Sequence, residues 1–272
     1  MNKYINLGKK IYNTANIKEY KRMIVFVARS LLHDKFMNKI IDFFDETPIK
    51  KAIISKEPFF IEILTRQVLF KNSTFEERYK IITNHFNIIL NKFNELFIEK
   101  VYLNNGIKLW EEDYNGKKLY LKIDFESGQK KEGLMSLMLK LDDIKIYQMI
   151  FWIGYDKSKQ ESLFIGAMQG SNETEANKLI KDLTKYFYGY RTKNLILYMT
   201  RIIVKSLGIK KIYAISNKGY YANNHIRIDR KLKTSLDVFW EETGGIITND
   251  NRFYELPIEE SRKKFEEVKT HK

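Results

Sequence analysis

A basic turn near residue 190 contains the residues that could do chemistry most directly. Gly189 leads the turn, and Arg191 and Lys193 follow it, immediately before an apolar helical pattern. The first backbone N–H groups of a helix lack intrahelical partners, and the helix dipole adds partial positive charge there. Two cations at such a position predict a site for a phosphate or a carboxylate. The alternative interpretation is a loop with two solvated cations.

Two further residues could act as an acid or a base. His225 follows Asn223-Asn224 in an expected loop, where a neutral imidazole could take a proton from an amine or hydroxyl acceptor. Glu241 precedes Gly244-Gly245 and could reach a cleft in the same capacity. A surface histidine and a solvated glutamate are the alternatives at these two positions.

A helix and a strand would hold the basic turn in place. Apolar residues at three- and four-residue spacing predict one buried helical face; they are Leu195, Met199, Ile202, Ile203 and Leu207. Gly208 is expected to end this helix, since glycine takes the left-handed conformation without a Cβ penalty. A short run of strand formers, Ile212 to Ile215, then predicts a buried strand.

The middle of the chain has the pattern of a sheet. Apolar residues alternate with polar or interfacial ones from Leu119 to Phe125, which is typical of a half-buried strand. Further strands are expected at 134–141, 144–154 and 161–168. The loops between them are short, so the strands should form an antiparallel meander.

The first hundred residues have helical patterns. Apolar residues recur at helical spacing in Ile17–Leu32 and in Phe59–Phe70, and Thr74 with Glu77 forms a capping box. His85 lies in the helix that this box opens, and we expect a partly buried structural role for it. The predicted fold class is α+β: a helical N-terminal region (1–103) packed on a mixed α/β domain (104–272).

Composition limits the classes of function. The chain has 272 residues, 44% of them hydrophobic, and a net charge of +14 that would attract anionic partners. Lysine, isoleucine and asparagine are all abundant, as an AT-rich genome also produces. The chain has no cysteine, which excludes disulfides and thiolate metal sites, and no metal site is expected. No apolar run approaches the ~20 residues that span a bilayer. The expectation is a cytoplasmic protein that is either soluble or peripheral at the inner membrane.

Several blocks resemble the VirK/YbjX family, a bacterial domain family of unknown function. They include, in order, Ser73 to Phe86, Lys131 to Leu137, Ile165 to Gly170, Leu183-Thr184-Lys185, Gly189 to Lys193, Ala214 to Asn217, and Phe239 to Gly245. Two departures occur: the family usually has proline where this chain has Thr192, and often a histidine near Tyr220. The resemblance implies a role in the cell envelope, in virulence and in resistance to cationic antimicrobial peptides, but no agreed chemistry.

The succession of meander, basic turn, helix and strand also resembles the acyl-CoA half of GNAT-type transferases. That resemblance implies pyrophosphate binding at the turn and helix start, and an asparagine and a tyrosine serving the thioester region. Carried over, the cofactor-binding residues are Gly189, Arg191, Lys193, Asn194, Asn217 and Tyr221. Acyl-CoA would be the cofactor. Because the glycine-rich part of the usual turn is reduced to Gly189, the analogy is one of fold, which also hosts binding modules.

Three functions from different classes therefore stay open. The first is a transferase that moves an acyl or aminoacyl group to a cell-surface precursor. The second is a non-catalytic accessory protein that supports envelope biogenesis by contacts with protein or lipid. The third is RNA binding, although the sequence lacks the aromatic-basic strand pattern of RNA-recognition domains. The expected partners are an anionic ligand or lipid surface and a protein, rather than nucleic acid.

Overall fold

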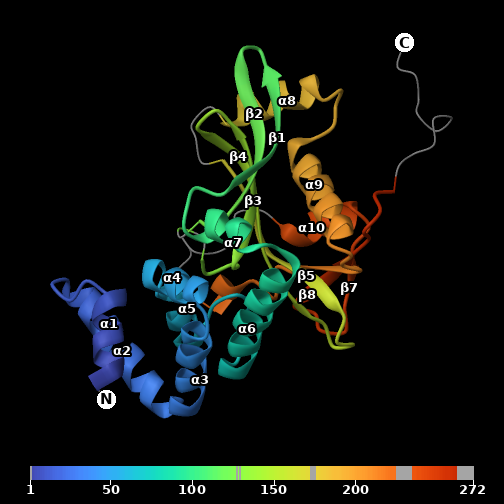
Figure 1. The fold of residues 1–272 in the computed structure, drawn as a ribbon. Coiled ribbons are helices and arrows are strands. Elements are labelled where there is room, and N and C mark those ends of the chain that lie inside the picture. Colours follow the sequence, from blue (N-terminus) through green and yellow to red (C-terminus); the bar gives the residue numbers. More distant parts are fainter. Residues whose placement is uncertain (1, 127, 129, 172–175, 225–234, 262–272) are drawn as a thin grey trace, which may run out of the picture.

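The computed structural model describes the chain except residues 1, 127, 129, 172–175, 225–234 and 262–272 (Figure 1). The N-terminal helices are α1 (Asn2–Ile11), α2 (Ile17–Leu32), α3 (Asp34–Asp45), α4 (Pro48–Lys56), α5 (Phe59–Glu62), the 3-10 turn η1 (Ile63–Thr65), α6 (Phe75–Lys92) and α7 (Glu95–Tyr102). The later helices are α8 (Ala176–Tyr186), α9 (Thr192–Ser206), the 3-10 turn η3 (Tyr221–Asn224) and α10 (Leu236–Glu242).

The described strands form one sheet. They are β1 (Ile107–Tyr114), β2 (Lys117–Asp124), β3 (Met135–Leu141), β4 (Ile144–Tyr155), β5 (Glu161–Gly170), β6 (Lys211–Ile215), β7 (Ile246–Ile247) and β8 (Phe253–Leu256). Their order is β1-β2-β3-β4-β5-β6-β8-β7. Within the described residues, β5 and β6 pair in parallel and the other neighbours are antiparallel. The predicted α+β class and meander are confirmed.

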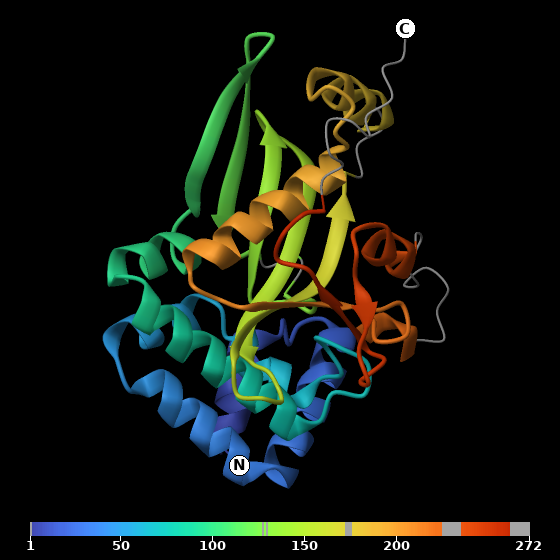
Figure 2. The ribbon, with the colours of Figure 1, turned by 90° about the vertical axis from the view of Figure 1, so that its right-hand side faces the viewer.

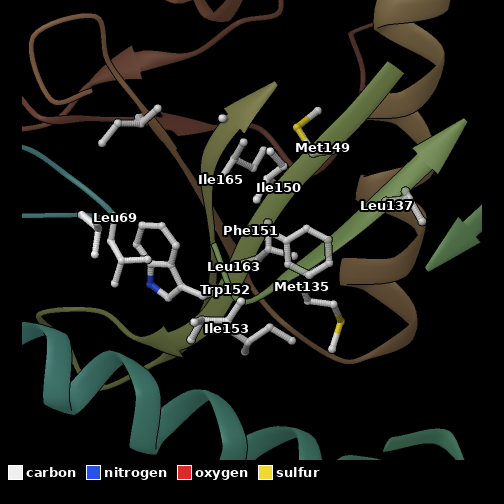
Figure 3. Packing of buried hydrophobic residues seen from close by; sticks show 14 of the residues in the cluster. Leu69, Met135, Leu137, Met149, Ile150, Phe151, Trp152, Ile153, Leu163 and Ile165 are labelled. Atoms are coloured by element: carbon white, nitrogen blue, oxygen red, sulfur yellow. The ribbon is translucent and has the colours of Figure 1, made fainter. Parts of the chain in front are cut away.

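Helices cover the sheet from different directions. α9 packs on β3 and β4, whereas α6 contacts β4, and α7 contacts β1 and β2. In Figures 1 and 2 the N-terminal helices gather at one end of the sheet and the β1–β2 hairpin projects at the other. Figure 3 shows Phe151 and Trp152 projecting to opposite sides of β4, and both are buried. The inner half of β4 is therefore buried on both faces.

His85 in α6 connects the helical region to the sheet. Its Nδ1 accepts a hydrogen bond from the backbone N–H of Ile153 (3.0 Å), so the ring proton belongs on Nε2. Nε2 lies 2.7 Å from the Tyr102 hydroxyl, which donates to the carbonyl oxygen of Leu134 (3.0 Å). Burial lowers the pKa of His85 to about 3, so the ring is neutral. Its role is structural, and its burial is complete rather than partial.

Local signals placed several helix ends correctly. The Thr74 side chain accepts from the Glu77 N–H, and the Glu77 carboxylate accepts from the Thr74 N–H, which is the predicted capping box. Gly208, with φ +69°, follows the end of α9. Gly189, with φ +88°, follows α8, and its N–H donates to the Thr184 carbonyl oxygen. Gly189 therefore allows the backbone to turn between α8 and α9.

The helical pattern over Phe59–Phe70 was only partly right. Helix α5 and the 3-10 turn η1 end at Thr65. Beyond them, Leu69 has φ +70°, and its N–H donates to the Lys131 carbonyl oxygen, while the Lys71 N–H donates to that of Gly219. The backbone here bonds to segments distant in sequence, which local periodicity cannot detect.

Candidate functional site

The end of β5 has an unusual setting in the sheet. β5 and β6 pair as far as Ile165 and Ala214, and β5 then continues to Gly170 without a strand neighbour on that side among the described residues. A bulge lies where the pairing ends, because Gly166 has no partner on β4 whereas the residues on either side do. Bulges re-aim side chains and end pairing, often beside active sites. In open sheets, ligands bind at the carboxyl ends of parallel strands.

Glu132 lies against this part of β5. A Cβ at Gly166 would come within 1.8 Å of the Glu132 carbonyl oxygen, so only glycine fits there. The Glu132 side chain is buried, and its Oε1 accepts from the Tyr220 hydroxyl at 2.5 Å. Its Oε2 accepts from Gln169 Nε2 at 2.7 Å. Burial raises the pKa of Glu132 above its usual value, against the effect of these hydrogen bonds.

Tyr220 and Tyr221 follow β6 and lie together, with ring centroids 5.1 Å apart. Tyr220 makes the contact with Glu132, and Tyr221, the tyrosine predicted to serve the thioester region, is its neighbour in the chain. Burial, followed by the Glu132 carboxylate, raises the pKa of Tyr220 well above its usual value. Its hydroxyl therefore stays protonated and acts as a hydrogen-bond donor.

α9 packs on β3 and β4. The charge of Arg191, at the start of α9, acts on Tyr147 of β4, whose partner across the sheet is Gly170 at the end of β5. Among the described residues, the buried hydroxyl of Thr192 and the buried amide oxygen of Asn194 have no hydrogen-bond partner. Buried polar atoms rarely lack partners, so two in one helical turn suggest that something binds there. A hydroxyl can donate to an anion, and so can the amide after a flip that exchanges its oxygen and nitrogen.

Glu242, at the end of α10, reaches the two cations of this turn. Its Oε2 lies 2.9 Å from Arg191 Nη2 and 3.4 Å from Lys193 Nζ. Lys193 also lies over the Phe239 ring, 4.6 Å from its centroid. The hydrogen bond from Arg191 lowers the pKa of Glu242. The Arg191 and Glu242 side chains are 48% and 41% exposed, so water screens their ion pair and an anionic ligand could replace Glu242.

Asn217 holds the start of α10 in place. Its amide oxygen accepts from the Leu236 N–H at 2.8 Å, and its amide nitrogen donates to the Ser235 hydroxyl at 2.8 Å. The backbone N–H of Asn217 donates to Asp237 at 2.6 Å. Asn217 therefore positions α10, and through it Glu242, instead of pointing at the first turn of α9.

Glu241, one of the two predicted acid-base residues, contacts β8 and not the first turn of α9. Glu241 accepts a hydrogen bond from the Tyr254 hydroxyl on β8 (2.8 Å), so it contacts β8 while Glu242 contacts α9. Burial raises the pKa of Tyr254 to about 12. His225 lies outside the described residues, and its role stays a prediction.

A groove of about 1100 Å³ opens on the sheet surface over Trp152, Phe164 and Tyr213. α6 and the exposed residues of β7 also line it. The three rings are neighbours across β4, β5 and β6, with centroids 5.5 and 5.1 Å apart and interplanar angles of 2° and 21°. Such short separations between nearly parallel rings are typical of offset stacking.

In the part of the chain that the structure describes, no three histidine or acidic side chains are grouped so that they could hold a metal ion. Within the same residues, each helix is too short or too polar to span a bilayer.

Comparison with known proteins gives the family. Residues 15–272 match DUF535, described as a protein family of unknown function. The chain belongs to the DUF535 family. This confirms the VirK/YbjX resemblance. The uncharacterized protein YbjX of Escherichia coli (strain K12) is 23% identical over 253 residues, which cover 91% of this chain and 76% of YbjX.

Two other relatives have comparable identity to this chain. The membrane protein LapB of Mannheimia haemolytica is 23% identical over 79% of this chain and 88% of LapB. An uncharacterized protein of Haemophilus influenzae is 24% identical over 78% of this chain and 72% of its own length. No solved structure matches the chain.

Sequence reasoning missed the buried group formed by Glu132, Gln169 and Tyr220. The signal was present, because Glu132 and Gln169 lie in two of the blocks that carried the family resemblance. Their proximity depends on a contact between residues 88 positions apart, Glu132 and Tyr220, which no local pattern predicts.

Proposed function

We propose that this DUF535 protein is a transferase that binds an acyl or aminoacyl donor through its phosphate groups and modifies a precursor of the bacterial envelope. The observation that carries the proposal is the first turn of α9. It combines two cations, two buried oxygens that lack hydrogen-bond partners among the described residues, and a position near Tyr147 of β4, which pairs with Gly170 at the end of β5. The order meander, basic turn, helix and parallel strand supports a GNAT-like build.

The residues present fit the phosphate part of an acyl-CoA-type donor. Free backbone N–H groups, Arg191 and Lys193 favour an anion, and Thr192 and Asn194 can add hydrogen bonds. Glu242 opposes binding through its own charge and would have to move aside. When bound, such a donor supplies a thioester whose carbonyl carbon an amine or hydroxyl can attack.

Glu132 is the described group whose surroundings best suit proton abstraction from the acceptor. Burial raises its pKa, which makes its carboxylate a stronger base than that of an exposed glutamate. Tyr220 and Gln169 orient the two carboxylate oxygens, each of which keeps a second lone pair for an acceptor. The acceptor's nitrogen or oxygen would bond to the carbonyl carbon, the C–S bond would break, and the acceptor's proton would pass to Glu132.

Release of thiol from acyl-CoA provides the test. Because the chain has no cysteine, any thiol detected by a colorimetric reagent comes from the donor. We expect slow release with water as acceptor, faster release with a fraction of envelope precursors, and at least ~100-fold less with Glu132→Gln. Glu241→Gln is the matched control and should retain activity. No release above the protein-free rate with any acyl donor, or full activity of Glu132→Gln, would contradict the proposal.

A non-catalytic accessory role is the second candidate. It is favoured by the engagement of Glu132 and Glu242 in contacts within the protein. A deletion strain complemented with wild type or Glu132→Gln separates the two. Altered envelope lipids that both versions restore would indicate binding without catalysis, and restoration by wild type alone would indicate a transferase.

A further inference from the structure

α2 has apolar residues on two opposite sides. One side packs inward, where Met23, Phe26 and Ser30 are buried. Large apolar side chains are exposed on the other side: Ile17, Tyr20, Ile24, Val25, Leu31 and Leu32. The exposed fractions reach 74% at Ile17 and 80% at Leu32. Single exposed apolar residues are normal, but a contiguous set marks an interaction surface.

Helical spacing makes these residues one stripe. Positions 17, 20, 24 and 31 lie on one side of a helix, and Ala28 continues the stripe between the last two. Val25 and Leu32 widen it. The 16-residue helix is about 24 Å long, so the stripe follows its full length. In Figure 1, α1 and α2 lie at the outer edge of the helical region, away from the sheet.

The charge around the stripe is strongly positive. Residues 1–40 contain nine lysines and arginines against two acidic residues, a net charge of +7, which is half of the +14 of the whole chain. Lys18 and Lys21 are exposed on α2 itself. Lys21 lies within the stripe, four residues after Ile17 and four before Val25.

This combination distinguishes between possible occupants. Lysine is depleted in the dry centres of protein interfaces, so Lys21 within the apolar stripe argues against a protein partner. At a membrane surface, the lysine stem can lie along apolar groups while its ammonium reaches the phosphates. Apolar residues and cations on one exposed helix are typical of helices that lie in the headgroup region of anionic bilayers.

We infer that α2 is a membrane-docking helix, whose exposed stripe enters the headgroup region of a bilayer rich in anionic lipid. The inference is independent of the transferase chemistry, because it rests on α2 and the charge of residues 1–40 alone. It also assigns a specific surface to the peripheral membrane location that the sequence left open.

Flotation of the full chain with lipid vesicles tests the inference. We expect binding to phosphatidylcholine vesicles that contain phosphatidylglycerol, little binding to phosphatidylcholine alone, and weakening by salt, since screening shortens the reach of the charges. Lys18→Gln with Lys21→Gln should weaken binding about thirtyfold, because each cation near the surface contributes a roughly fivefold factor. Ile24→Gln with Leu31→Gln should lower it at least ~10-fold.

Val238→Gln is the matched control, since Val238 is 54% exposed on α10; it should bind vesicles as wild type does. The Ile24/Leu31 variant changes exposed positions, so its melting temperature should stay close to that of wild type. Wild-type vesicle binding by that variant would overturn the inference. So would binding independent of anionic lipid. Self-association that light scattering detects in wild type and not in this variant would show instead that a second copy covers the stripe.

Discussion

Replacing Glu242 by glutamine should tighten anion binding at the first turn of α9. Glu242 competes directly with an anionic ligand, because its Oε2 forms ion pairs with Arg191 Nη2 (2.9 Å) and Lys193 Nζ (3.4 Å). Glu242→Gln removes that competition and the repulsion between the carboxylate and an incoming phosphate. Because the pair is exposed and screened, we expect a gain in coenzyme A affinity of about threefold to tenfold.

Isothermal titration calorimetry with coenzyme A measures the effect. The gain should shrink when salt is raised from about 0.01 M to about 0.15 M, since the screening length falls from ~30 to ~8 Å. Glu241→Gln is the matched control, because it removes the same charge one residue earlier, where the carboxylate contacts Tyr254 instead. Equal effects of the two variants would show a general charge effect, and an unchanged or weaker affinity in Glu242→Gln would refute the reasoning.

Two further predictions concern stability. The folded-state pKa of His85 is about 3, below its ordinary 6.5, so the folded protein binds fewer protons and loses stability as pH falls below 6.5. His85→Gln should remove ~3 kcal/mol of the loss in unfolding free energy between pH 7 and pH 4; parallel losses in urea titrations of both proteins would contradict this. Gly166→Ala should destabilise by at least ~2 kcal/mol through its clash with Glu132, whereas Gly154→Ala, whose Cβ would meet only atoms 3.7 Å or more away, should melt near wild type. Similar melting temperatures for both glycine variants would count against the packing at Gly166.

Local sequence signals predicted the elements well where one face of a strand or helix decides the pattern. The alternation from Leu119 to Phe125 gave β2, and the Thr74–Glu77 box gave the start of α6. β1 was missed because Glu111 and Glu112 follow Trp110 without a regular alternation, as suits a strand at the sheet edge that is partly exposed on both faces.

Of the candidate site, the sequence predicted only the two cations. Arg191 and Lys193 precede a helix in the sequence, and a helix does start there. Their partner Glu242 lies 51 residues beyond Arg191, and the pairing depends on how Asn217 places α10. Sequence patterns report local conformation, whereas ion pairs and buried hydrogen bonds between distant segments depend on the packed fold.

Native mass spectrometry of the purified protein with added coenzyme A tests the central claim most directly. The proposed function predicts one coenzyme A bound per wild-type chain, and loss of that complex in the Arg191→Ala/Lys193→Ala variant, with little change in melting temperature. Equal binding by wild type and the double variant, or no complex with wild type, would contradict an anion site at the start of α9.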